Sequence, residues 1–95
     1  MTTPDHIRAH RHSSQHRDET IASELCGCFY RCETFPPSEI QTWVDEFALR
    51  KEETPVGQTA LCPRCRIDAV IGSESGYPLT PEFLALMRSH WFGTV

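Results

Sequence analysis

No stretch of this 95-residue chain approaches the ~20 consecutive apolar residues that a membrane-spanning helix needs. The N-terminal residues MTTPDHIRAHRHSSQHRDET also lack the apolar segment of a secretory signal. We therefore expect no membrane contact and a cytoplasmic chain whose thiols stay reduced. Reduced thiols favour a metal site over disulfides, and the odd number of cysteines, five, points the same way.

The body of the chain is short of positive charge. Residues 18–95 hold six basic and twelve acidic side chains, whereas residues 1–17 hold three arginines against one aspartate. Tight binding to a nucleic-acid backbone needs a clustered positive face. The acidic body therefore argues against such binding, although it leaves room for a small basic patch.

A chain of this length makes one small domain. The core of such a domain usually needs disulfides or a bound metal ion for additional stability. We expect residues 14–95 to form that domain. Residues 1–13 are rich in histidine and arginine and almost free of large apolar side chains, which predicts a flexible arm. Its histidines have workable metal-ligand spacings, but a tail that binds metal adventitiously explains them more simply.

Cys62 and Cys65 form a C-x2-C motif with a proline after the first cysteine. Residues 59–61 and 67–71 on either side favour strands. The pattern predicts a hairpin of strand, tight turn and strand in which both sulfurs face one point. A thiolate pair with this spacing is half of a tetrahedral zinc site.

The other half of the site should come from the remaining cysteines, Cys26, Cys28 and Cys32. Their spacing permits more than one pair, and we favour Cys28 with Cys32, with Cys26 as a substitute ligand. One Zn²⁺ would then be held by four thiolates. Such a closed set leaves no position for water, so the ion would be structural. Buried free thiols are the alternative.

Arg31, Arg64 and Arg66 lie on or beside these cysteine turns. Because a four-thiolate zinc centre carries a formal charge of about −2, neighbouring arginines would offset it. The sharper alternative is that these arginines contact an anion or a partner.

The remaining apolar residues recur at helical spacing. We predict a docking helix over 14–25 that buries Ile21 and Leu25, a helix beginning at Ser38, and a last helix with Thr80 as its N-cap. The fold class is therefore α+β: a zinc-knuckle β-hairpin, similar to a zinc ribbon, packed by two or three short helices. The predicted core comprises Trp43, Phe47, Phe83, Met87 and Trp91.

The motifs CGCFY at 26–30, TALCP-x-C at 59–65 and IDAVIGSESGYPLT at 67–80 resemble those of a family of small uncharacterised bacterial proteins. The resemblance covers most of the chain outside residues 1–13. It implies a bacterial, cytoplasmic protein with a zinc-ribbon-like fold and brings no established activity. Two positions depart from the family pattern, which has a cysteine at position 31, here Arg31, and a glycine at position 66, here Arg66. A turn at position 66 that prefers positive φ would strain an arginine.

No nucleophile and base stand together in the sequence, which favours a non-enzymatic zinc-binding module that contacts or regulates a protein partner. The alternative is a nucleic-acid-binding zinc ribbon that uses the knuckle arginines. A metal-dependent enzyme is the least favoured hypothesis, because it needs an open metal position with Cys26 or His90 competing for the site. The sequence gives no prediction of the oligomeric state.

Overall fold

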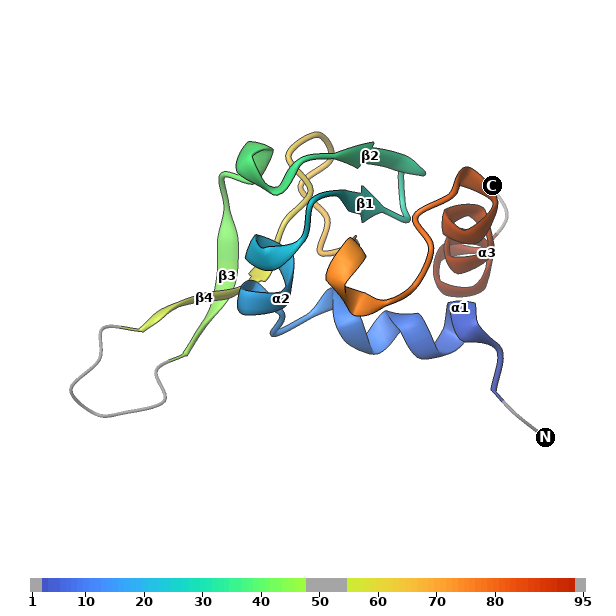
Figure 1. Ribbon diagram of the computed structural model, residues 1–95, viewed down its shortest axis with the longest axis horizontal. Coiled ribbons are helices and arrows are strands. Elements are labelled where there is room, and N and C mark those ends of the chain that lie inside the picture. The colour runs from blue at the N-terminus through green and yellow to red at the C-terminus, as the bar shows by residue number, and fades with distance from the viewer. Residues whose placement is uncertain (1–2, 48–54, 94–95) are drawn as a thin grey trace.

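The computed structural model describes residues 3–47 and 55–93, and it confirms the α+β class (Figure 1). Within these residues the strands form two antiparallel sheets. The first sheet has the order β2 (Glu33–Phe35), β1 (Cys26–Cys28), β5 (Val70–Gly72). The second pairs β3 (Trp43–Phe47) with β4 (Val56–Ala60). The helical elements are α1 (Asp5–Arg8), η1 (Ala9–Ser13), α2 (Arg17–Ala22), η2 (Pro37–Glu39), η3 (Ser73–Ser75) and α3 (Pro81–Phe92).

Strand β1 lies at the centre of the first sheet, and every residue of β1 and β5 is buried. Helix α3 packs on β1 through Leu84. A Cβ atom added at Gly27 would lie 3.3 Å from both Leu84 Cδ atoms, so glycine allows the helix to approach the strand closely. The helix begins as predicted, because the Thr80 side chain accepts a hydrogen bond from the backbone N–H of Phe83 at 3.2 Å.

The predicted core is confirmed at Phe83 and Met87, which are buried, and Trp43 packs against the core while partly exposed. Trp91 is an exception, because 39% of its surface is exposed. Its indole stacks on the His10 ring with centroids 3.8 Å apart. The side chain of Phe47 lies outside the described part of the structure.

Residues 5–13, expected to belong to a flexible arm, instead form α1 and η1 and pack on the domain. Helix α1 contacts α3, and η1 contacts β5. Ala9 is fully buried and Ser13 almost so. The sequence did not indicate this packing, because a small alanine and the stacked His10 make the contact in place of large aliphatic side chains.

The predicted helix over 14–25 is shorter in the structure, where α2 covers only Arg17–Ala22 and begins after His16. Asp18 and Glu19 occupy its first turn, as expected. Its inward residue is Thr20, whereas Ile21 and Leu25, predicted to be buried, are exposed.

The prediction of a helix beginning at Ser38 is wrong. A single 3₁₀ turn, η2, ends at Glu39, and Ile40 already has an extended backbone (ψ 121°). Trp43–Phe47 then form β3, with Trp43 opposite Ala60 of β4. Aromatic and β-branched residues fit a strand as well as a helix. Here the pairing with β4 determines that this segment forms a strand.

The two segments that flank Cys62 and Cys65 do form strands, β4 and β5, although they do not pair with each other. Strand β4 pairs with β3, and β5 pairs with β1. The predicted hairpin is therefore opened out, and the turn that carries these cysteines bridges the two sheets (Figure 1). Within the described residues, every helix falls short of the length and apolarity that crossing a membrane demands.

Candidate metal centre

Cys62 to Arg66 form a tight turn, here named the second knuckle. The N–H of Cys62 donates to Ile67 O, and the N–H of Arg66 donates to Cys62 O, both at 2.9 Å. The Cys62 sulfur accepts the N–H of Arg64 at 3.4 Å. Arg66 has a φ of 65°, the left-handed conformation that a glycine would adopt without strain. The expectation drawn from position 66 is thus confirmed.

Cys28 to Cys32 form the first knuckle, which follows β1. The N–H of Cys32 donates to Cys28 O at 2.7 Å, and the Cys28 sulfur accepts the N–H of Arg31 at 3.5 Å. Cys32 has a φ of 56° and is also left-handed. The N–H of Phe29 donates to Ala69 O at 2.9 Å, which ties this knuckle to the segment that follows the second one.

The two knuckles bring three sulfur atoms together. The Sγ atoms of Cys28, Cys62 and Cys65 all lie within 4.8 Å of one another. Those of Cys28 and Cys65 are 3.7 Å apart. Two thiolates on a tetrahedral zinc ion with Zn–S bonds near 2.3 Å would be ~3.8 Å apart. Three cysteines therefore lie close enough together to hold a metal ion.

The other two cysteines do not belong to this cluster. Cys32, the predicted fourth ligand, directs its sulfur toward Phe29 O at 4.0 Å. Cys26, the predicted substitute, is fully buried and contacts Thr20 O at 4.0 Å. Cys26 and Cys28 sit two positions apart on β1 and are both buried, but only the Cys28 sulfur joins those of Cys62 and Cys65.

The three clustered thiols differ in acidity. Burial raises the pKa of the Cys28 thiol well above its ordinary value, and burial also raises the pKa of Cys65. Burial acts in the same direction on Cys62, but hydrogen bonds from the N–H groups of Arg64 and Cys65 and from the two other thiols outweigh it and lower its pKa. Cys62 is therefore the first thiol of the cluster to ionise. Outside the cluster, burial raises the pKa of Cys26 to about 11.

Two of the knuckle arginines, Arg31 and Arg64, form ion pairs at the surface. Arg31 Nε donates to Glu33 at 2.7 Å. Arg64 lies 3.7 Å from Glu33 and 3.5 Å from Glu39. Arg66 is exposed. Such pairs lower the net positive charge that these arginines present to an anion.

His90 is not part of the group of three cysteines. Its ring packs edge-on against Trp91 and against His6, with centroids 4.6 Å and 5.9 Å away. Among the described residues, the three cysteines are the only group of three or more His, Cys, Asp or Glu side chains close enough to share an ion.

Comparison with protein-family models, with curated proteins and with solved structures finds no match for this chain. The metal centre consequently rests on the geometry of Cys28, Cys62 and Cys65 and on the chemistry of thiolates. The resemblance to small bacterial proteins remains an expectation from the sequence motifs.

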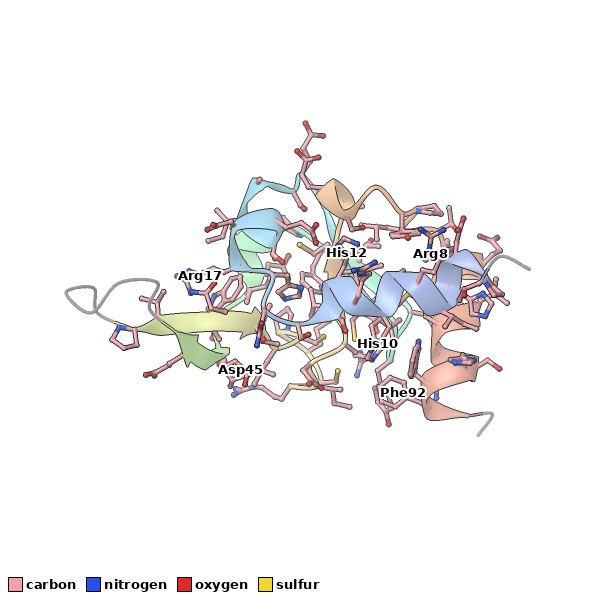
Figure 2. All side chains as sticks on the ribbon, turned by 90° about the horizontal axis from the view of Figure 1, so that it is seen from below. Arg8, His10, His12, Arg17, Asp45 and Phe92 are labelled. Carbon is pink, nitrogen blue, oxygen red and sulfur yellow. The ribbon has the colours of Figure 1, made fainter. Side chains whose placement is uncertain are left out.

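One polar network had no signal in the sequence. The ring of His16 accepts the N–H of Ala60 at Nε2 (3.1 Å), while Nδ1 donates to His12 O. The N–H of Gln15 donates to Thr59 Oγ1 at 2.8 Å, and that hydroxyl donates to Asp45 at 2.7 Å. Together these bonds attach the N-terminal segment to β4. Figure 2 shows that segment running from α3 toward the β3–β4 pair.

Proposed function

We propose that this protein binds one Zn²⁺ through Cys28, Cys62 and Cys65 and that the ion is structural. The observation that carries the proposal is the meeting of three sulfurs from two knuckles that are 34 positions apart in the sequence, within 4.8 Å. Thiolates are soft ligands and favour zinc over magnesium, calcium or manganese. Sites in which sulfur ligands close the tetrahedron around the ion are also typical of structural zinc.

The position of the cluster supports a structural role. The first knuckle continues β1, in the centre of the first sheet, whereas the second knuckle begins two residues after β4 of the second sheet. An ion held by both would therefore cross-link the two sheets. A domain of this size gains much of its stability from such a link.

We further propose that the module acts by contacting a protein partner. The support is electrostatic, since Glu33 and Glu39 pair with Arg31 and Arg64, and the chain carries a formal net charge of −4. A surface balanced in this way suits a protein better than a polyanion. The nucleic-acid hypothesis would need these arginines to leave their carboxylates.

Removing the metal tests the structural role. Zinc-loaded protein is treated with a strong chelator, and folding is followed by near-ultraviolet circular dichroism and urea unfolding. We expect chelation to lower the free energy of unfolding by several kcal/mol, with recovery when zinc is added back. A chain that keeps the same unfolding midpoint after all its metal has been removed would contradict a structural ion.

A further inference from the structure

We infer that the metal ion in this centre receives only three ligands from the chain and takes its fourth from outside, as the thiolate of a small thiol. This inference rests on the proposed metal binding and names the ligand that completes the same site. It comes from a comparison of the two knuckles. Their backbones are alike, but cysteine and arginine exchange places at two neighbouring positions.

The two knuckles share three backbone features. In each, the carbonyl of the first cysteine accepts the N–H of the residue four positions later, at 2.7 Å for Cys32 to Cys28 and 2.9 Å for Arg66 to Cys62. In each, the sulfur of the first cysteine accepts a backbone N–H from within the turn. In each, the residue four positions later is left-handed, with φ of 56° and 65°.

This match pairs residues of the two knuckles by position. Cys62 corresponds to Cys28, and Arg66 corresponds to Cys32. Cys65, which directs its sulfur into the cluster, then corresponds to Arg31. The first knuckle thus carries an arginine at the position from which the second knuckle supplies its second sulfur.

Cys32 does not replace the missing ligand. It stands one position too late, on the left-handed residue, and its sulfur contacts Phe29 O at 4.0 Å and is not one of the three sulfurs that lie within 4.8 Å of one another. Arg31 cannot replace it either, because a guanidinium stays protonated and has no lone pair to donate. Three corners of the tetrahedron therefore have a sulfur, and the fourth does not.

The cluster reaches the protein surface at Cys65, which is only partly buried. The side chains of Arg31 and Arg64, on the two knuckles, are 43% and 47% exposed. Zinc with three thiolates accepts a further soft ligand. On binding, the thiol gives its proton to the buffer and its sulfur lone pair forms the new bond, with no change in oxidation state.

Cobalt substitution provides the readout, because the sulfur-to-cobalt charge-transfer absorption grows with the number of thiolates on the ion. The full chain is loaded with Co²⁺ under a phosphine reductant, so that no thiol is present, and is then titrated with 2-mercaptoethanol or glutathione. We expect this absorption to rise by about one third as three thiolates become four. A rise that instead follows protein concentration, without added thiol, assigns the same chemistry to a cysteine of a second copy.

Three variants make the test specific. Arg31→Cys should show the higher absorption with no added thiol and should not respond to one. Cys32→Ser should match the unmodified chain, and Arg31→Ala should still respond, which separates the new sulfur from the lost charge. An absorption that falls in Cys32→Ser, or an unmodified chain that ignores both thiols, would overturn the inference. A chain that binds no cobalt or zinc would instead overturn the proposed function.

Discussion

The Nε2 atom of His16 accepts a hydrogen bond from the backbone N–H of Ala60 at 3.1 Å, although the two residues are 44 positions apart. Only a neutral imidazole can accept this bond, and the ring is buried. Burial lowers the pKa of His16. The hydrogen bond to His12 and the negative charge of Glu19 raise the pKa, but their effect is smaller than that of burial. The N-terminal segment is thus attached to β4 by a histidine that must stay uncharged.

This attachment predicts a loss of stability in mild acid. Because the folded pKa of His16 lies below the unfolded value of 6.5, its contribution is complete above pH 6.5 and is lost as the pH falls through the folded pKa. We expect the stability difference between the unmodified chain and His16→Gln to shrink between pH 7.5 and pH 5. Urea unfolding at both pH values measures it, and taking the difference removes contributions common to both chains. His90→Gln, at an exposed position, is the control.

The packing of η1 gives a second prediction. Ala9 is fully buried, so Ala9→Leu should overfill the contact and cost about 1–3 kcal/mol in unfolding free energy. Arg11→Leu introduces the same side chain at an exposed position of η1 and should change stability by less than about 0.5 kcal/mol. Equal, negligible effects of both substitutions would mean that residues 5–13 do not pack on the domain in solution.

Metal affinity should depend steeply on pH. Burial raises the pKa of Cys28 and of Cys65, so both thiols must release protons when an ion binds, whereas the pKa of Cys62 is lowered. Each proton released per ion raises the affinity about tenfold per pH unit, so release from Cys28 and Cys65 alone gives about 100-fold per pH unit near neutrality. Competition with a zinc indicator between pH 6.5 and pH 7.5 gives this slope. A flat profile would mean that the thiols are not the ligands.

Nucleic-acid binding should be absent at ~50 mM salt, because Glu33 occupies both Arg31 and Arg64. Fluorescence anisotropy with a labelled oligonucleotide tests this expectation. Glu33→Gln releases Arg31 and removes one of the two carboxylates that pair with Arg64, so weak, salt-sensitive binding should emerge only in this variant. Salt-dependent binding by the unmodified chain that disappears in Arg64→Ala would instead favour the nucleic-acid hypothesis over a protein partner.

Local chemistry in the sequence was sufficient for several features of the structure. The C-x2-C spacing predicted the turn that carries Cys62 and Cys65, and Thr80 followed by Pro81 predicted the start of α3. In both cases residues within one turn of each other determine the conformation. The left-handed backbone at position 66 was expected for a different reason, namely the glycine that the resembling family has at this position.

Features that depend on distant partners were not predictable in this way. Trp43 and Val44 suit a helix face as well as a strand, and only the pairing with β4 decides between them. The spacing between cysteines in the sequence favoured Cys32 as a ligand. That spacing carries no information on backbone conformation, and Cys32 occupies the left-handed position of the first knuckle. The bond between His16 and Ala60 joins two segments with no shared motif.

The most direct test of the metal centre is the zinc content per chain, measured by elemental analysis on the untagged protein and on single Cys→Ser variants. We predict about one zinc in the unmodified chain and in Cys32→Ser, and a large loss in Cys28→Ser and Cys65→Ser. Cys32→Ser is a matched control, because it removes a sulfur from the same knuckle as Cys28. Loss of zinc in Cys32→Ser equal to that in Cys65→Ser, or a folded, unmodified chain with far less than one zinc, would contradict the three-cysteine centre.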